Sequence, residues 1–310
     1  MSREPHGPLP EVRLPRVSLV IATYNAASTL PAAIASAVAQ TYPHLEIIVV
    51  DDGSTDGTRE AVEPFLGWVR LIQIEHAGVA SARNAGVSGS SGAFVCYLDA
   101  DDTLAPNRVE RQVKFFATLP PEVGMVFTNA LVRSNISERL AYEVPPGVAH
   151  AYERLLLGNF IFAATAMIRR TCFAAVGPYD EALETGEDYD FFLRLARSFE
   201  IRYLHEPLYC CSEHERSLMA CTPPARQRRT LQRILDKQFS DPAFPPTLRR
   251  LRRPATANVL REVARQHLAR GERLAAVAAL AAGVAADPAA LLSGPRLGRY
   301  ARAALRVRRP

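Results

Sequence analysis

The sequence predicts an α/β protein with a mainly parallel sheet flanked by helices, followed by a basic helical extension at its C-terminal end. Three features of the 310 residues lead to this class. Short apolar runs alternate with amphipathic segments at the spacings of βαβ units. Two of these runs end directly in clusters of aspartates, and beyond residue 222 the composition becomes rich in arginine and alanine. The length suits one large domain with an appendage.

The first part of the chain, from residue 17 to about 128, carries the clearest pattern. Continuous apolar runs are typical of buried parallel strands. Leu30, Ile34 and Val38 recur at helical spacing after Ser28, a suitable N-cap. We expect strands at 17–22, 45–50, 69–74, 93–98 and 124–128, and helices at 29–40, 58–65, 78–88 and after Pro106. This alternation favours a Rossmann-like sheet.

The pattern of apolar residues is less regular from about 129 to 216, and beyond residue 223 it favours helices. The polar, proline-rich residues 1–15 lack the apolar segment of a secretory signal, so we expect a loose tail there. Further strands are expected at 163–169 and 201–204, and helices at 188–197, 225–238 and 255–286, the last with a hairpin near 270–273.

Charge is distributed unevenly along the chain. The net charge is +5, yet residues 226–310 hold 18 Arg and one Lys against five acidic residues, a net +14 that leaves −9 for the rest. Such asymmetry suggests different partners for the two parts. No apolar stretch approaches the roughly 18 residues that span a bilayer. The five cysteines, with Cys96 inside an apolar run, suit a reducing compartment, so the expected location is cytoplasmic.

The aspartate clusters are the main indication of function. The run at 45–50 leads into Asp51 and Asp52, and the run at 93–98 leads into Asp99, Asp101 and Asp102. Open α/β sheets bind ligands beyond the carboxyl ends of their strands. Crowded carboxylates repel one another unless a cation lies among them, and a D-x-D on an extended segment points two carboxylates to one side. The pattern predicts a divalent cation with a phosphate-bearing ligand.

Two blocks of sequence extend this interpretation: VSLVIATYNAASTLPAAIASAVAQTYPHLEIIVVDDGSTDGT and GVASARNAGVSGSSGAFVCYLDADDTLAPNRVE. With them, residues 16–216 resemble a family 2 glycosyltransferase of GT-A fold. The resemblance implies a glycosyltransferase domain at 16–222, with a nucleotide-binding half at about 16–128 and an acceptor-binding half at about 129–222. Residues 223–310 form the extension. The chain lacks the Q-x-x-R-W motif of processive synthases in that family, which favours transfer of a single sugar.

The resemblance also implies which residues bind the nucleotide sugar. Thr23, Tyr24 and Asn25 would line the site, with the Tyr24 ring against the base, since aromatic rings prefer a flat π partner. A packed residue at the strand end is the alternative role of Tyr24. Asp52 would accept a hydrogen bond from a base N–H, and Asp51 would support the turn.

The same resemblance assigns the diphosphate and metal region. Arg83 would face the nucleotide or its phosphates, with a surface ion pair as the alternative. Asp101 would coordinate Mn²⁺ or Mg²⁺ bound to the diphosphate, and Asp99 would bind the ribose, or the metal through water. Asp102 would hold the loop. His214 would lie near the diphosphate or metal, with a surface-loop histidine as the alternative.

A third acidic cluster opens the helix expected at 188–197. Carboxylates are stabilised at helix N-termini, so Glu187 and Asp188 could simply cap this helix. The resemblance implies instead that Asp188 is the catalytic base and that Glu187 positions the acceptor. The implied reaction is inverting transfer from a nucleotide-diphosphate sugar, a UDP-sugar, to an acceptor hydroxyl in cell-surface polysaccharide or glycolipid synthesis.

Several alternatives remain open at this point. A sugar-phosphate nucleotidyltransferase would show a Gly-rich loop with Arg after the first strand, where this chain has Ala22 to Asn25. A second alternative function is that of a protein that binds a nucleotide sugar without catalysis. The basic run at 249–253 could rest on anionic lipid headgroups near a glycan or lipid-linked acceptor, giving peripheral membrane association, or it could reflect composition alone. Nucleic acid is not an expected partner, because aromatic residues do not alternate with the basic ones.

Overall fold

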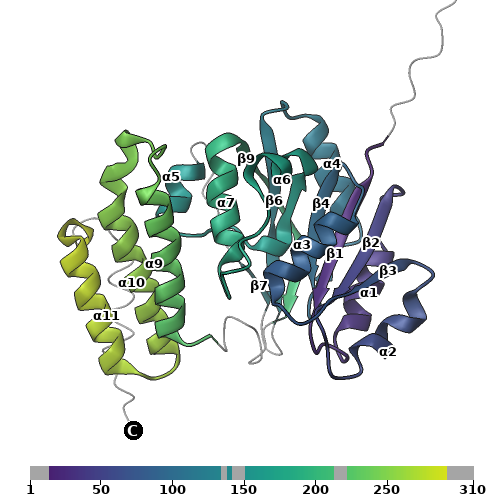
Figure 1. Ribbon diagram of the computed structural model, residues 1–310, viewed down its shortest axis with the longest axis horizontal. Coiled ribbons are helices and arrows are strands. Elements are labelled where there is room, and N and C mark those ends of the chain that lie inside the picture. The colour runs from purple at the N-terminus through teal and green to yellow at the C-terminus, as the bar shows by residue number, and fades with distance from the viewer. Residues whose placement is uncertain (1–13, 134–137, 142–150, 213–221, 292–310) are drawn as a thin grey trace, which may run out of the picture.

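The computed structural model describes residues 14–133, 138–141, 151–212 and 222–291. A twisted sheet with helices on both faces fills one end of the molecule, and a group of long helices fills the other (Figure 1). The predicted α/β class, with a mainly parallel sheet and a helical C-terminal part, is confirmed.

In the described part of the chain the sheet has nine strands, and its four longest pairings are all parallel. Along the sheet the order is β3 (Val69–Gln73), β2 (Leu45–Asp51), β1 (Val17–Thr23), β4 (Phe94–Asp99), β8 (Ala166–Arg169), β6 (Val123–Arg133), β9 (Glu200–Ser212) and β5 (Thr103–Leu104). β7 (Glu138–Leu140) pairs with β6. The shorter pairings, which involve β5, β7 and β8, are antiparallel.

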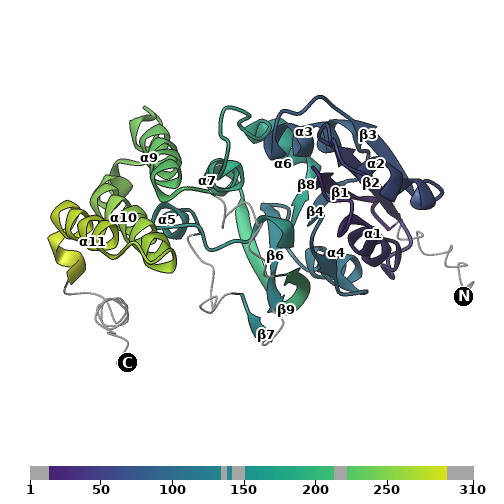
Figure 2. The ribbon, with the colours of Figure 1, turned by 90° about the horizontal axis from the view of Figure 1, so that it is seen from below.

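Both faces of the sheet are covered because its central strands are apolar on both sides. Val20 and Ile48 face one core, and Leu19 and Val49 face the other. Figure 2 shows α3 and α6 on one side and α1 and α4 on the other. The helices are α1 (Leu30–Val38), α2 (Thr58–Val62), α3 (Val79–Gly89), α4 (Arg108–Ala117), α5 (Ala151–Leu156), α6 (Arg170–Val176), α7 (Glu187–Ser198), α9 (Pro224–Ser240), α10 (Arg252–Ala269) and α11 (Arg273–Ala286). Short 3₁₀ turns are η1 (Glu63–Phe65), η2 (Ala163–Thr165), η3 (Pro246–Leu251) and η4 (Pro288–Leu291).

Some elements differ from the sequence-based expectation. The strand expected at 163–169 begins with the 3₁₀ turn η2, and the short strand at 201–204 is part of the much longer β9. By contrast, the hairpin expected near 270–273 is confirmed: α10 and α11 are separated at Gly271, whose φ of +76° is readily adopted by glycine. The N-cap of α1 is Thr29 rather than Ser28.

The helical extension shares a core with the sheet domain. Ile234 and Phe239 of α9 and Phe244 after it belong to the same buried cluster as Leu155 of α5 and Phe192 of α7. By contrast, α11 packs mainly on α10. Among the described residues, no helix is long and apolar enough to cross a membrane.

Candidate active site

The aspartate clusters meet at one edge of the sheet because the strands that carry them are parallel. In register, Thr23 of β1 lies beside Asp51 of β2, and Ala22 lies beside Asp99 of β4. The carboxyl ends of three neighbouring strands therefore meet here, the place where open α/β sheets bind ligands.

Asp52 is buried and holds the loop that leads into α3. Its carboxylate accepts hydrogen bonds from the backbone N–H groups of Ala77 at 2.8 Å and Gly78 at 2.9 Å, and His76 Nδ1 lies 2.9 Å from it. The expected bond from Asp52 to a nucleotide base stays a prediction. What the structure adds is that Asp52 fixes the position of His76.

His76 completes an aromatic pair that the sequence did not reveal. Its ring stacks on Tyr24, with 4.0 Å between the ring centroids and 20° between the planes. Tyr24 is 45% exposed, so one side of its ring packs while part of it faces solvent. A lone histidine before a helix gives little sequence signal, and only the fold brings it to Tyr24.

The turn after β1 is tied to the turn after β2. Asn25, with φ of +49°, donates its N–H to Ser54 Oγ and accepts from the N–H of Thr55 through Oδ1. Asp51 accepts from the N–H of Ser54 at 3.0 Å. Thr23 Oγ1 is buried without a hydrogen-bond partner in the described part of the chain.

Arg83 of α3 lies in the interior, between two carboxylates. It is 5% exposed, and it donates to Glu187 of α7 at 2.5 Å and to Asp99 of β4 at 3.3 Å. Its guanidinium also lies over the rings of Tyr97 and Tyr179. The alternative role of Arg83, an ion pair at the surface, is therefore wrong: Arg83 does form ion pairs, but its side chain is buried. Contact with phosphates stays a prediction.

The turn after β4 is held by β9. Asp102, which is buried, accepts hydrogen bonds from the Tyr209 hydroxyl and the N–H of Ser212, both at 2.7 Å. The Tyr209 hydroxyl also accepts from the N–H of Asp99 at 3.2 Å. Burial, followed by the charge of Asp99, raises the pKa of Asp102 to about 7. Burial likewise raises the pKa of Asp99, and the charge of Asp101 adds to this.

These carboxylates are suitable ligands for a hard divalent cation. Asp99 and Asp101 supply oxygen donors in one turn, and a cation there would relieve the repulsion between them, which adds to the effect of burial on the pKa of Asp99. Within the described residues, no group of three or more His, Cys, Asp or Glu side chains is gathered around a metal position. His214, the third expected ligand, lies outside the described residues.

Glu187 and Asp188 open α7, directly after Gly186. Glu187 is 5% exposed, and burial, partly offset by Arg83, raises its pKa to about 7. Asp188 is half-buried, and burial raises its pKa as well. One of its oxygens accepts from the N–H of Tyr189 at 2.7 Å, and the other lies 3.4 Å from Asn159 Nδ2. The first turn of α7 thus faces the aspartates of the sheet edge through Arg83.

Residues 18–177, which hold most strands of the sheet and the aspartates at its edge, match the sequence profile described as Glycosyl transferase family 2. The chain belongs to this family. The matched residues make up more than half of the chain and include both sequence blocks on which the resemblance rested, apart from Val17.

The names of similar proteins also indicate glycosyltransferases. The uncharacterized glycosyltransferase RP339 of Rickettsia prowazekii is 33% identical over 200 residues, which are 63% of this chain and 63% of that protein. A UDP-Glc:alpha-D-GlcNAc-diphosphoundecaprenol beta-1,3-glucosyltransferase, WfgD of Escherichia coli, is 30% identical over 196 residues, or 63% of this chain and 75% of that protein. The chain therefore spans less than two thirds of the Rickettsia protein's length.

Solved structures share the fold. TarS 1–349 of S. aureus in complex with UDP-GlcNAc superimposes with a TM-score of 0.64 at 19% identity, over 87% of this chain and 81% of that one. The mannosyltransferase PcManGT of Pyrobaculum calidifontis, in complex with GDP-Man and Mn²⁺, gives a TM-score of 0.62 at 23% identity, over 94% of this chain and 81% of that one. At these identities the likeness concerns the fold.

Proposed function

We propose that this protein is an inverting glycosyltransferase that moves one sugar from a nucleotide-diphosphate sugar, a UDP-sugar, to an acceptor hydroxyl. The observation that carries the proposal is the buried bridge of Arg83 between Asp99 and Glu187. It joins the edge of the sheet, where a diphosphate would lie, to the carboxylates of α7. The names of the Escherichia coli relative and the S. aureus complex support a UDP-sugar donor.

Asp188 is the proposed base. As the acceptor oxygen attacks the anomeric carbon, its proton passes to Asp188, and the bond from that carbon to the diphosphate breaks with its electron pair on the leaving nucleoside diphosphate. One attack opposite the leaving group inverts the anomeric centre. Because burial raises its pKa, the Asp188 carboxylate is a stronger base than an exposed aspartate. Glu187 would orient the acceptor.

The donor would occupy the sheet edge. Tyr24, stacked on His76, offers a partly exposed aromatic ring for the base, and Asp52 contacts His76. Thr23 and Asn25 line the neighbouring turn. Mn²⁺ or Mg²⁺ held by Asp99 and Asp101 would neutralise charge on the leaving diphosphate. Arg83 adds a fixed cation beside Asp99 whether or not a metal is bound.

A donor panel tests this proposal. UDP-, GDP- and dTDP-sugars are incubated with the protein, with and without Mn²⁺ or Mg²⁺, and release of the nucleoside diphosphate is measured. Asp188→Asn is expected to bind the donor normally and to lose turnover by a factor on the order of 10² to 10⁴. Near-wild-type turnover of that variant would exclude Asp188 as the base. Release of pyrophosphate from a nucleoside triphosphate and a sugar phosphate would favour a nucleotidyltransferase, and donor binding without any release a non-catalytic binder.

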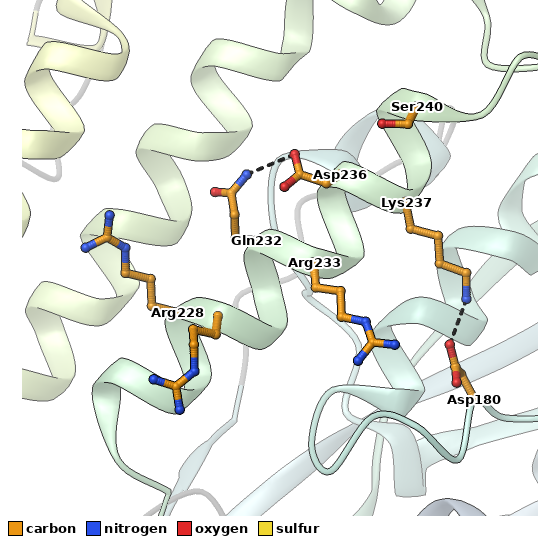
Figure 3. Close-up of a pocket in the computed structure, with 8 residues that line it drawn as sticks. Asp180, Arg228, Gln232, Arg233, Asp236, Lys237 and Ser240 are labelled. Atoms are coloured by element: carbon orange, nitrogen blue, oxygen red, sulfur yellow. Dashed lines mark hydrogen bonds and ion pairs between the residues drawn. The ribbon is translucent and has the colours of Figure 1, made fainter.

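We also propose that the acceptor is a cell-surface glycan or a lipid-linked sugar, and that the protein contacts the inner face of the cell membrane. Arg249, Arg250, Arg252 and Arg253 are all exposed. A hollow between α9 and the loop before α7 has cationic side chains at four of its eight lining residues (Figure 3): Asp180, Arg228, Arg229, Gln232, Arg233, Asp236, Lys237 and Ser240. Its two carboxylates already bind neighbours, Lys237 and Gln232. Basic surfaces of this kind attract anionic lipid headgroups.

Co-sedimentation with vesicles tests the membrane contact. The full-length protein is expected to bind vesicles that contain phosphatidylglycerol and not those of phosphatidylcholine alone, and to be released by salt. Replacement of the four arginines at 249, 250, 252 and 253 by glutamine should weaken this binding. Equal binding to both vesicle types, or no binding, would contradict the membrane contact, and the basic residues would then reflect only the composition of the chain.

A further inference from the structure

Helix α9 touches the turn that precedes the proposed base. Gly186, just before Glu187 and Asp188, has a φ of +74°, and a Cβ placed on it would lie 3.1 Å from Ile234 Cδ1 and 3.5 Å from Thr230 Cγ2. Both the backbone conformation and the close approach of α9 favour glycine there. The start of α7 is therefore shaped partly by the extension.

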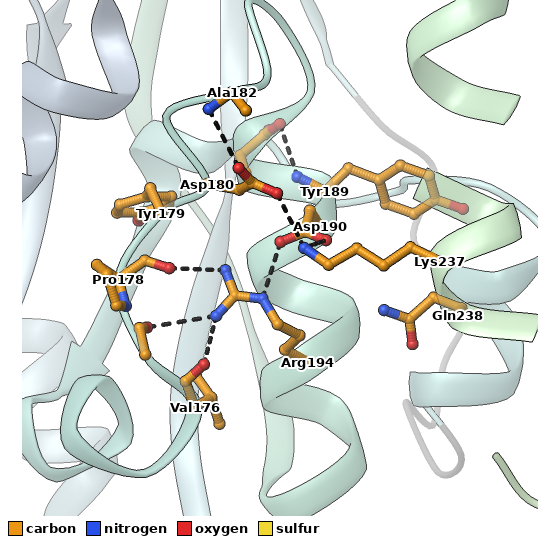
Figure 4. A network of polar contacts seen from close by, with 12 residues as sticks. Val176, Pro178, Tyr179, Asp180, Ala182, Tyr189, Asp190, Arg194, Lys237 and Gln238 are labelled. Atoms are coloured by element: carbon orange, nitrogen blue, oxygen red, sulfur yellow. Dashed lines mark hydrogen bonds and ion pairs between the residues drawn. The ribbon is translucent and has the colours of Figure 1, made fainter. Parts of the chain in front are cut away.

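A buried ion pair links the same two helices. Asp190 is fully buried in the first turn of α7, where its N–H donates to the carbonyl of Gly186. One of its oxygens accepts from Arg194 at 2.8 Å, and Lys237 Nζ of α9 lies 2.9 Å from the other (Figure 4). That second oxygen accepts no regular hydrogen bond within the described residues, so Lys237 supplies its compensating charge.

The partners of this pair are themselves fixed. Lys237 also binds Asp180, at 3.0 Å, in the loop that leads to α7. Arg194 donates to the carbonyls of Val176 and Pro178 at the start of that loop. Next to Lys237, Gln238 accepts a hydrogen bond from the Tyr152 hydroxyl at 3.1 Å. The loop, the first turn of α7 and α9 are thus joined through polar contacts around Asp190.

We propose that Lys237 is a positioning residue of the active site: by pairing with Asp190 it keeps the first turn of α7, and with it Glu187 and Asp188, in place beside Arg83. The inference rests on the proposed function. Without Lys237, Arg194 would still pair with one oxygen of Asp190, but the other oxygen would be buried without a cation or a hydrogen-bond donor among the described residues. A buried carboxylate in that state takes up a proton or moves toward water. Asp190 lies two residues after Asp188, so its movement displaces the base.

Hydrogen exchange of the full-length protein tests the positioning without reference to activity. In Lys237→Met, the peptide that covers 186–194 should exchange at least fivefold faster, while peptides from β1, β2 and β4 remain unchanged. Lys237→Arg should restore the wild-type rate, because it keeps the charge. Arg228→Met is the matched control, an exposed cation on the same helix, and should have no effect. An unchanged rate for 186–194 in Lys237→Met would overturn the proposal.

Kinetics then separate positioning from folding. With the donor that the panel identifies, Lys237→Met should lower kcat for nucleoside diphosphate release about tenfold while the KM for donor changes less than twofold. Asp190→Asn should have a similar effect, and the double variant should be no worse than either single one, since both remove the same pair. Additive losses, or a loss in KM alone, would overturn the proposal. If the wild type releases no nucleoside diphosphate, the proposed function fails, and the exchange data still judge the role of Lys237.

Discussion

Arg83 is the residue on which the candidate site depends. Its planar guanidinium presents five N–H donors, so one side chain can serve both Glu187 and Asp99 while its face rests on Tyr97 and Tyr179. All of these groups are removed from bulk water to a large extent, which makes each charge depend on its partner.

Removal of this guanidinium should destabilise the fold in a pH-dependent way. Arg83→Met is expected to lower the free energy of unfolding by about 3–5 kcal/mol near pH 8, because the buried Glu187 and the partly buried Asp99 lose their cation. At pH 5 the loss should be smaller, since those carboxylates can hold a proton instead. Urea denaturation at both pH values measures this. Arg59→Met, an exposed arginine on α2, should stay within about 0.5 kcal/mol at both. Equal losses at pH 5 and pH 8 would contradict the role given to Arg83.

Glu187 gives the protein a stability that falls as the pH rises. Its pKa of about 7 in the folded chain exceeds its ordinary value of 4.5, so between these two values the folded state binds more protons than the unfolded state. The free energy of unfolding should therefore decline across this window, by an amount on the order of 3 kcal/mol from this group. Glu187→Gln should flatten the decline in a urea series from pH 4.5 to pH 7.5. An unchanged slope would mean that Glu187 ionises normally.

At the scale of elements, β9 holds the turn after β4 at the proposed metal site. Tyr209 of β9 donates to Asp102 and accepts from the N–H of Asp99, so one hydroxyl fixes both ends of the turn at 99–102. This link connects residues more than a hundred positions apart in the sequence.

Loss of that hydroxyl should loosen the turn. Tyr209→Phe keeps the ring in its packed place and leaves a buried oxygen of Asp102 without its donor, which costs about 1–3 kcal/mol of stability. If Mn²⁺ binds at this turn, its affinity should fall as well, because Asp99 is less well placed. Isothermal titration with Mn²⁺ and urea denaturation measure the two effects. Unaltered stability in Tyr209→Phe would show that the turn does not need β9.

The sequence predicted best those strands that are buried on both faces. β1, β2 and β4 are covered on both faces and appear as continuous apolar runs. β9 alternates irregularly between buried and exposed residues and contains Pro207, so only its first part was expected. β5 has two residues and exists because it pairs with β9, a contact that no local pattern reveals.

The candidate site was predictable in its parts and not in its connections. Apolar runs that end in aspartates place Asp52 and Asp99 at one sheet edge, and the carboxylates of α7 stand out as a helix start. The bridge from Arg83 to Glu187 spans 104 positions, and the stack of His76 on Tyr24 depends on two separate loops. Neither leaves a periodic or compositional trace, because each arises only when the chain has folded.

At the scale of the whole molecule, the extension is expected to be necessary for folding. A chain that ends at residue 222 would lose Ile234, Phe239 and Phe244 and expose the apolar sides of α5 and α7. It should aggregate or unfold without cooperativity. A chain that ends at residue 271 loses α11, which packs mainly on α10, and should still unfold cooperatively. Size-exclusion chromatography and urea denaturation of both truncated chains measure this. A well-folded, monomeric chain ending at 222 would show that the predicted boundary of the glycosyltransferase domain also marks an independent folding unit.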